Sequence, residues 1–246
     1  MDGTMQLYHG DCLEILPTLE AGSVDMVLAD PPYGTTACSW DSVIDLTAMW
    51  RELKRVIKPN GAIVLFGSDP FTSVLITSNL KQFKYRWVWD KGRGVGHLVA
   101  KYRPMQRTED IPVFGKGRVN YSPIMRRYDS PRFSIEYGRT SIMGGKLNAN
   151  DTGKMLTHKH PSNVIEYMWS PTTSLKKKKK PVFVLRYLIR TYTNKGDTVL
   201  DFCMGSGSTL VACIEEERNG IGIERDAGYF EIAKKRIEQE QTKPRT

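Results

Sequence analysis

The sequence predicts an α/β fold with a doubly wound, mostly parallel sheet. Four short apolar runs have the length of buried strands: residues 24–28, 62–66, 198–200 and 220–223. Stretches with the period of amphipathic helices separate them, which is the alternation typical of parallel sheets. Three of the runs lead into acids, namely Asp30, Asp201 and Glu224. Ligands of such folds bind in the crevice at the carboxyl ends of the strands, so these acids mark the expected site.

The first 114 residues contain the other elements expected before the chain changes character. A strand at residues 6–9 precedes a turn in which Asp11 can cap the helix at residues 12–19. A clear apolar stripe predicts a helix over residues 43–58, which Pro59-Asn60-Gly61 is expected to end. Further elements are a helix at residues 71–80, a strand at 85–89 and a strand at 111–114.

The last third of the chain is predicted to alternate helix and strand. Pro181 opens a helix that continues to Tyr192, as proline in a first turn commonly does. The strands ending in Asp201 and Glu224 are then followed by two helices, over residues 210–218 and 227–241.

Length and composition fit one large domain over residues 1–246, since 246 residues with 40% hydrophobic content can bury a substantial core. No apolar run approaches the roughly 18 residues of a membrane span, and the amino terminus has no signal-peptide pattern. We therefore expect a cytoplasmic protein with no membrane partner. The four cysteines show no CxxC spacing, so neither a metal site nor a disulfide framework is predicted.

Positive charge is concentrated in the middle of the chain. The net charge is +9, and residues 92–160 hold 13 Lys or Arg against 5 Asp or Glu. Arginines mixed with aromatic residues on irregular structure suit phosphate and base contacts, so residues 92–179 are expected to form an inserted DNA-binding lobe. The candidate contacts are Arg93, Lys101, Arg103, Arg107, Arg126, Arg127, Arg132 and Arg139. The alternative is a solvated basic loop, and Lys176–Lys180 can equally be a solvated linker.

The loop Asp30-Pro31-Pro32-Tyr33 is the candidate catalytic segment. Two prolines stiffen it and fix the direction of the Pro31 carbonyl, while Tyr33 places an aromatic face beside the Asp30 carboxylate. A carboxylate, a carbonyl and a ring together suit a planar amine, which has two N–H groups and a heterocycle that can stack. The alternative is an ordinary proline-rich turn at a strand end.

A second site is expected where residues 198–224 run strand, Gly-x-Gly turn, helix, strand and acid. Gly205 and Gly207 let the backbone approach a ligand, and Glu224 can accept both hydroxyls of a ribose. A third glycine of the dinucleotide pattern is lacking, so an adenosine with a carboxylate-bearing tail fits as well.

Both segments resemble motifs of the DNA methyltransferases that modify the exocyclic amines of adenine (N6) or cytosine (N4). Asp30–Tyr33 resembles their catalytic motif, and Asp201–Thr209 resembles their S-adenosylmethionine motif. The catalytic motif comes first, as in the so-called beta group. The resemblance implies the S-adenosylmethionine-dependent methyltransferase fold in a circularly permuted motif order, with the basic segment as target-recognition lobe.

The resemblance also implies roles for particular residues. The catalytic residues are Asp30, Pro31, Pro32 and Tyr33. The implied cofactor contacts are Asp11, Asp30, Lys180, Pro181, Asp201, Phe202, Gly205, Ser206, Gly207, Ser208, Glu224 and Arg225. One departure is that Lys176–Lys179 replace part of the family's segment before the cofactor strand.

The function expected from this resemblance is methyl transfer from S-adenosylmethionine to adenine N6 of a flipped-out base in double-stranded DNA. Adenine is favoured because Asp is the commoner first residue of the motif among adenine enzymes. The alternatives are cytosine-N4 methylation and a DNA-binding module with a decayed cofactor site. RNA or protein-glutamine methylation fits the motif order poorly, and carbon-5 cytosine methylation lacks its proline-linked cysteine. We expect a monomer or homodimer of the kind found in restriction-modification systems.

Overall fold

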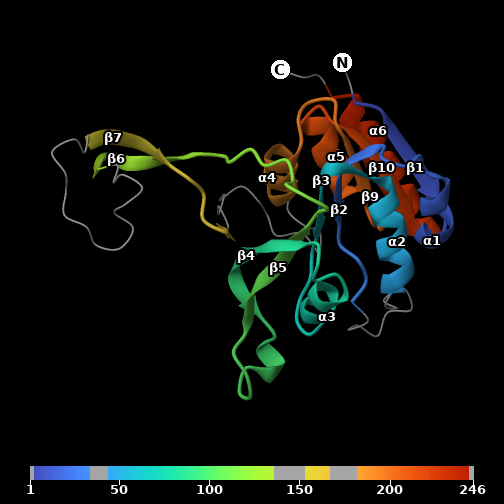
Figure 1. Ribbon diagram of the computed structural model, residues 1–246. Helices are drawn as coiled ribbons and strands as arrows, with labels where there is room; N and C mark the ends of the chain where they lie inside the picture. Colours follow the sequence, from blue (N-terminus) through green and yellow to red (C-terminus); the bar gives the residue numbers. More distant parts are fainter. Residues whose placement is uncertain (1–2, 34–43, 136–152, 167–181, 244–246) are drawn as a thin grey trace. The chain divides into compact units, whose positions relative to one another are not determined.

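The computed structural model describes residues 3–33, 44–135, 153–166 and 182–243 (Figure 1). Its elements are β1 (Met5–His9), α1 (Cys12–Ile15), the 3-10 turn η1 (Leu16–Thr18), β2 (Val24–Ala29), α2 (Leu46–Val56), β3 (Ile57–Leu65), α3 (Phe71–Ser78), β4 (Phe83–Val95), the 3-10 turn η2 (His97–Val99), β5 (Gln106–Phe114), β6 (Arg126–Ile135), β7 (Gly153–Lys159), β8 (Val164–Ile165), α4 (Val182–Tyr192), β9 (Thr198–Asp201), α5 (Ser208–Glu215), β10 (Asn219–Glu224) and α6 (Ala227–Gln241). Within these ranges, no helix has both the length and the apolar character needed to cross a membrane.

Eight strands form one sheet in the order β1-β10-β9-β2-β3-β5-β4-β8. The pairs from β1 to β3 are all parallel, whereas β5 runs antiparallel to both β3 and β4. The predicted α/β class and mostly parallel sheet are confirmed. From β2 the chain continues through α2 to β3, and from β9 it continues through α5 to β10 on the other side. The sheet order therefore reverses between β2 and β9, the kind of place where α/β folds bind ligands.

Helices cover both faces of this sheet. On one face, η1, α2 and α3 contribute Leu16, Leu53 and Phe71 to a buried cluster. On the other face, α4 and α5 pack through Leu188 and Cys213. Helix α6 joins α5 in a smaller cluster beside β1 and β10. The apolar stripe predicted for residues 43–58 is confirmed in α2, because its apolar positions face the core.

One acid is buried inside the sheet. Asp25 on β2 is 7% exposed. Its carboxylate accepts hydrogen bonds from Lys58 Nζ at 2.7 Å and from the Thr198 amide at 2.9 Å. Because Thr198 begins β9 and Lys58 lies in β3, this carboxylate fixes the amino-terminal ends of three neighbouring strands. It thereby sets the relative positions of β2 and β9, whose far ends carry Asp30 and Asp201.

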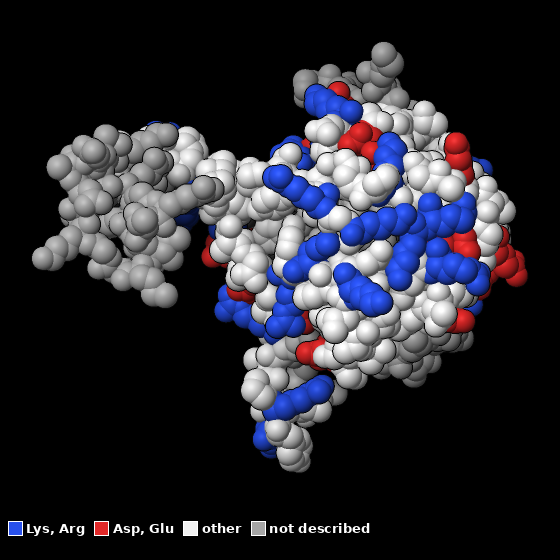
Figure 2. Space-filling model, in the orientation of Figure 1, with Lys and Arg blue, Asp and Glu red and all other residues white. Residues whose placement is uncertain are grey.

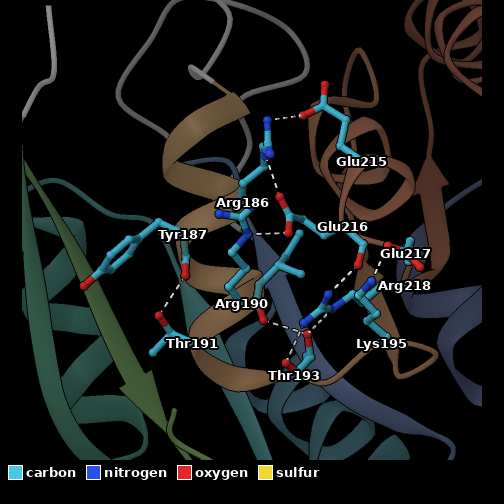
Figure 3. A network of polar contacts seen from close by, with 11 residues as sticks. Arg186, Tyr187, Arg190, Thr191, Thr193, Lys195, Glu215, Glu216, Glu217 and Arg218 are labelled. Carbon is cyan, nitrogen blue, oxygen red and sulfur yellow. Dashed lines mark hydrogen bonds and ion pairs between the residues drawn. The ribbon is translucent and has the colours of Figure 1, made fainter. Parts of the chain in front are cut away.

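A second buried acid holds two helices together on the α4–α5 face, as Figure 3 shows. Glu216 accepts a hydrogen bond of 2.5 Å from Arg186 Nε and another from Arg190 Nε. Arg218 donates to the Glu216 carbonyl and, at 2.7 Å, to the Thr193 carbonyl. These five residues, here called the Glu216 clamp, join α4 and the loop after it to the end of α5.

The helix predicted to reach Lys58 ends two residues earlier, and Pro59-Asn60-Gly61 lie within β3. Helix α2 ends at Val56, and Ile57 already pairs with β2. The pairing is interrupted by a bulge before it resumes at Ala62. A Cβ atom at Gly61 would lie 2.7 Å from the Asp25 carbonyl, so the bulge needs glycine there. The chain therefore turns from helix to strand without a separate loop.

Two strands are longer than their sequence patterns predict. The strand expected at residues 85–89 extends over Phe83–Val95, and the strand expected at 111–114 extends over Gln106–Phe114. They pair with each other as an antiparallel hairpin, which supplies hydrogen bonds to residues whose own pattern gives no strand signal. The helix expected at residues 210–218 likewise ends earlier, at Glu215, and Glu217 adopts a positive φ of 60°.

Residues 123–162 form a compact unit separate from residues 1–122 and 163–246. Within it, β6 and β7 pair antiparallel in a region where the sequence shows little periodicity. The first part of the predicted lobe, up to Phe114, instead belongs to the β4–β5 hairpin of the main sheet. The assignment of residues 92–179 to target recognition stays a prediction, and residues 136–152 and 167–179 of that segment lie outside the described residues.

Candidate active site

The predicted catalytic loop begins where β2 ends. The Tyr33 hydroxyl donates a hydrogen bond to Asp30 Oδ1, and the Tyr33 ring stacks on Phe71 at the start of α3, with centroids 5.0 Å apart and planes 29° apart. Burial, and secondarily the Asp30 charge, raise the pKa of Tyr33, so this hydroxyl remains a donor. Pro31 is buried and Pro32 half-buried. The structure thus holds a carboxylate and an aromatic ring in fixed positions beside each other.

The glycine-rich turn after β9 has the conformation that its sequence predicts. Gly205 and Gly207 have φ values of 52° and 75°, which side chains rarely adopt. Gly207 also packs closely, since a Cβ atom there would lie 3.0 Å from the Ala233 side chain of α6. A Cβ atom at Gly205 would meet nothing within 4 Å. Gly205 therefore leaves open space against which a ligand can approach the backbone.

Glu224, predicted to accept ribose hydroxyls, also braces this turn. Its Oε2 accepts a hydrogen bond from the Gly205 amide and its Oε1 one from the Asp226 amide, both at 2.8 Å. Each carboxylate oxygen has a second lone pair that can accept from a ligand. Because Glu224 ends β10, it connects the turn after β9 to the start of α6.

The turn after β1 lies next to the end of β10. The Gly10 amide donates to the Glu224 carbonyl at 3.0 Å. Asp11 caps α1 by accepting from the Leu13 amide at 2.8 Å, and its other oxygen lies 3.8 Å from Arg225 Nη1. The structure thus brings together Asp11, Glu224 and Arg225, which the sequence assigns to the cofactor.

Asp201, at the end of β9, is almost fully buried, with 4% of its surface exposed. Burial raises its pKa to about 7, and the charges of Asp30 and Glu224 act in the same direction. Hydrogen bonds from the Thr209 hydroxyl and from the Cys203 amide, the latter at 3.2 Å, only partly oppose this rise. The crevice between β2, β9 and β10 is therefore rich in carboxylates, which favours a positively charged ligand.

Phe202 and the serines of the turn occupy different surroundings. Phe202 is 1% exposed and lies in the core cluster against which Tyr33 packs. Its side chain therefore supports the loops from beneath. Ser206 and Ser208 both accept hydrogen bonds through their hydroxyl oxygens from Arg236 Nη1, at 2.9 and 3.2 Å, and the Ser206 carbonyl accepts from the same atom.

Arg236 is a residue that the sequence analysis misses. It lies on α6, three residues after Ala233 and one before Ile237, both of which are buried. This spacing places Arg236 beside the buried face of the helix, and that is the only signal in the sequence that could have drawn attention to it. Because one nitrogen reaches three oxygens of the turn, Arg236 fixes the turn from the side of α6.

The predicted DNA-contacting residues fall into two groups. Arg93, Lys101 and Arg103 are exposed on the β4–β5 hairpin, where Arg107 pairs with Asp90 through two bonds of 2.6 and 2.7 Å. Arg126, Arg127 and Arg132 belong to the separate unit at residues 123–162. There the Arg132 guanidinium lies 5.1 Å from the centre of the Tyr128 ring. Arg139, Lys180 and Pro181 lie outside the described residues.

With this geometry in place, comparison with known proteins assigns the family. Residues 24–235 match the N6/N4 methyltransferase family, described as DNA methylase. The chain belongs to this family. The predicted resemblance is confirmed, and this N6/N4 DNA methylase is a DNA methyltransferase.

Relatives and solved structures extend the match over nearly the whole chain. The type II methyltransferase M.HpaI of Haemophilus parainfluenzae is 28% identical over 96% of this chain and 74% of its own length. The DNA adenine methyltransferase YhdJ of Escherichia coli (strain K12) is 28% identical over 94% and 82%. The M1.HpyAVI–SAM complex, at 25% identity, gives a TM-score of 0.63 over 95% of this chain and 99% of that one. The cofactor predicted for the family is confirmed by that complex.

Proposed function

We propose that this N6/N4 DNA methylase transfers the methyl group of S-adenosylmethionine to adenine N6 in double-stranded DNA, at a short specific site. The observation that carries the proposal is the Asp30–Tyr33 loop. It holds a carboxylate and a ring at the point where the sheet order reverses, beside the acidic crevice at the end of β9.

The residues of the crevice fit the cofactor. Bound there, S-adenosylmethionine supplies an electrophilic methyl group on a positively charged sulfonium. The carboxylates of Asp30 and Glu224 lie close enough to Asp201 to raise its pKa, and such a group of carboxylates suits a cation. Glu224 can accept from hydroxyl groups, and the open side of Gly205 leaves room for an adenosine against the backbone.

The catalytic loop can activate an exocyclic amine through hydrogen bonds alone, without a covalent bond between the base and the protein. The amine lone pair is delocalised into the base, so the nitrogen is a poor nucleophile. The Asp30 carboxylate accepts from Tyr33 through Oδ1, and because a carboxylate has several lone pairs it can also accept an amine hydrogen while the Pro31 carbonyl accepts the second. Both bonds favour a tetrahedral nitrogen whose lone pair points at the methyl group, and fixed acceptors need no reorganisation during the reaction.

Adenine is proposed over cytosine on two grounds. The first residue of the motif is Asp30, the commoner choice among adenine enzymes. The relative YhdJ, which matches 94% of this chain, is a DNA adenine methyltransferase. The cytosine-N4-specific PvuII methyltransferase gives a TM-score of 0.66 at 14% identity, a likeness that shows the shared fold alone.

The test is methyl transfer from labelled S-adenosylmethionine to unmethylated genomic DNA, followed by nucleoside digestion and mass spectrometry. We expect N6-methyladenine, and sequencing of the modified DNA then gives the recognition site. N4-methylcytosine would keep the mechanism and overturn the base assignment. Absence of product, with cofactor binding retained in calorimetry, would instead support a DNA-binding module without activity.

A further inference from the structure

The β4–β5 hairpin ends in a tip, residues 95–105, that exposes apolar side chains. Leu98 is 98% exposed and Tyr102 is 89% exposed, while Val95 and Met105 are 49% and 43% exposed. Four of the eleven large hydrophobic residues found exposed in the described structure lie within this one short segment. Such a concentration of exposed apolar surface is a mark of a binding site.

The tip is an ordered turn and not a loose loop. Gly96 has a φ of 98°, and its carbonyl accepts from the Val99 amide at 3.1 Å. The Val99 carbonyl then accepts from the amides of Tyr102 and Arg103 at 3.0 and 3.1 Å. These bonds fix the backbone while Leu98 and Tyr102 point away from any core. The fixed backbone of the turn therefore keeps both side chains exposed.

The neck of the hairpin is braced as well. A Cβ atom at Gly94 would lie 2.7 Å from Met105 Cβ, so the two strands pack closely just below the tip. One step further down, Arg107 and Asp90 form their two-bond ion pair across the hairpin. Close packing and an ion pair therefore hold the two strands together just below the tip.

The charge around the tip matches a polyanion. Residues 92–105 contain Arg93, Lys101 and Arg103 and no acid, whereas the charge of Arg107 is balanced by its ion pair with Asp90. Figure 2 shows Lys and Arg side chains on the hairpin together with uncharged surface at its end. Some DNA-binding proteins combine basic residues, which bind the DNA, with an apolar side chain that is inserted between two base pairs. The hairpin tip has both kinds of residue.

The base of the same hairpin reaches the catalytic loop. Asp110 exchanges two backbone hydrogen bonds with Gly67, of 2.9 and 3.0 Å, just before α3. Glu109 is close enough to Tyr33 for its charge to raise the tyrosine pKa. From Glu109 to Gln106, where β5 begins, a strand covers roughly 10 Å, so the tip begins about that far along the hairpin from a residue beside the catalytic loop.

We propose that the hairpin tip enters the target duplex, and that Leu98 and Tyr102 occupy the base stack beside the displaced nucleotide. This inference rests on the proposed function, since it takes double-stranded DNA as the substrate. Displacing a base leaves its neighbours unstacked, and apolar or aromatic side chains placed there reduce that loss. The basic residues of the hairpin position the duplex. Leu98 and Tyr102 stabilise the open state of the base pair.

The test compares single-turnover methylation by Leu98→Ala, Tyr102→Ala and the double variant. The substrates are a duplex carrying the site mapped by methylation sequencing and the same duplex with a mismatch opposite the target base. We expect the double variant to be at least tenfold slower on the matched duplex and within threefold of wild type on the mismatched one, because the mismatch has already weakened the pair. Tyr102→Phe, which keeps the ring, should retain the wild-type rate.

Leu80→Ala is the matched control, since Leu80 is also exposed, at 66%, but lies in the turn before β4, at the end of the hairpin opposite the tip. It should leave both rates unchanged, and S-adenosylmethionine affinity by calorimetry should be the same in all variants. Equal rates for wild type and double variant on the matched duplex would overturn the inference and leave the proposed function standing. Equal losses on both duplexes would also overturn it. A wild-type chain that methylates no DNA would overturn the proposed function and this inference with it.

Discussion

Glu216 and Asp201 are carboxylates of nearly equal burial, 5% and 4% exposed, yet their surroundings differ. Glu216, directly after α5, accepts hydrogen bonds from two guanidinium groups, those of Arg186 and Arg190. Asp201, at the end of β9, accepts from a hydroxyl and an amide, neither of which carries a charge. Burial raises the pKa of Asp201 to about 7, and the charges of Asp30 and Glu224 in the crevice act in the same direction.

The difference separates a structural acid from an acid poised for a ligand. A buried carboxylate paired with cations is satisfied by the fold itself, as in the Glu216 clamp (Figure 3). A buried carboxylate beside other carboxylates raises the free energy of the unliganded protein, and a cation relieves it. The comparison predicts that changes near Asp201 alter cofactor binding and catalysis, while changes in the clamp alter stability.

The largest effect is expected for Asp30→Ala on the functional side of this comparison. It removes a fixed acceptor for the amine, so methyl transfer should fall by roughly 10²–10³-fold or more. The thermal midpoint should change little, because Asp30 is exposed at the end of β2. The S-adenosylmethionine affinity should fall far less than the rate, because two of the three crevice carboxylates remain. Single-turnover rates, calorimetry and thermal denaturation check this. Loss of the thermal midpoint together with activity would instead make Asp30 structural.

Next in size is Glu216→Ala on the structural side. It leaves Arg186 and Arg190 without their shared partner, and a free energy of unfolding lower by about 1–3 kcal/mol is expected, because the two arginines remain partly solvated. Urea denaturation measures it. Glu216→Gln, which keeps the shape of the side chain, is the matched control and should lose less. Well below the unfolding midpoint, methyl transfer should match wild type, and a specific loss of activity would contradict the structural role.

A smaller effect is expected when Asp201 loses its charge. Because S-adenosylmethionine binds as a cation, its affinity should fall as Asp201 becomes protonated below pH 7, by at most about tenfold per pH unit, and level off above. Asp201→Asn should bind more weakly at pH 8 and lose this slope. Calorimetry across pH 5.5–8.5 tests both, and an unchanged slope in the variant would assign the pH dependence elsewhere.

Asp201 also makes the stability of the fold depend on pH. As the pH rises, cofactor affinity should increase, whereas stability should decrease. The folded-state pKa of Asp201, about 7, lies above its ordinary value of 3.8, so the folded chain binds more protons between these values. Its contribution to stability therefore decreases as the pH rises from about 4 to about 7. The urea midpoint of wild type should fall relative to that of Asp201→Asn across this window. A parallel pH dependence in both proteins would argue against the raised pKa.

The smallest effect is expected for Arg236→Ala, which removes the donor shared by Ser206 and Ser208. The turn should become less well fixed, and S-adenosylmethionine affinity should fall about 2–10-fold, as expected for one lost group of hydrogen bonds. Lys235→Ala, one position earlier and exposed, is the control and should bind like wild type. If both variants bind equally well, Arg236 does not position the turn.

Local sequence patterns predict most of the helices and strands of the fold. The helix at Ala227–Gln241 and the strands leading into Asp30, Asp201 and Glu224 follow from apolar spacing, because the period reports which side of each segment is buried. Helix α2 ends before the predicted Lys58 because Ile57 already pairs with Val24 of β2, a partner that lies far away in the sequence. The hairpin strands were underestimated because their outer halves gain hydrogen bonds only from each other.

The sequence by itself determined the family, the order of the elements and the loops that carry Asp30, Gly205 and Gly207. These features depend on residues adjacent in the chain, whose conformational limits are local. Only the tertiary structure decided that Asp201 has a raised pKa, that Arg236 braces the turn and that Leu98 stands exposed. Charge interactions, burial and hydrogen bonding depend on distances between segments far apart in sequence, and folding alone sets those distances.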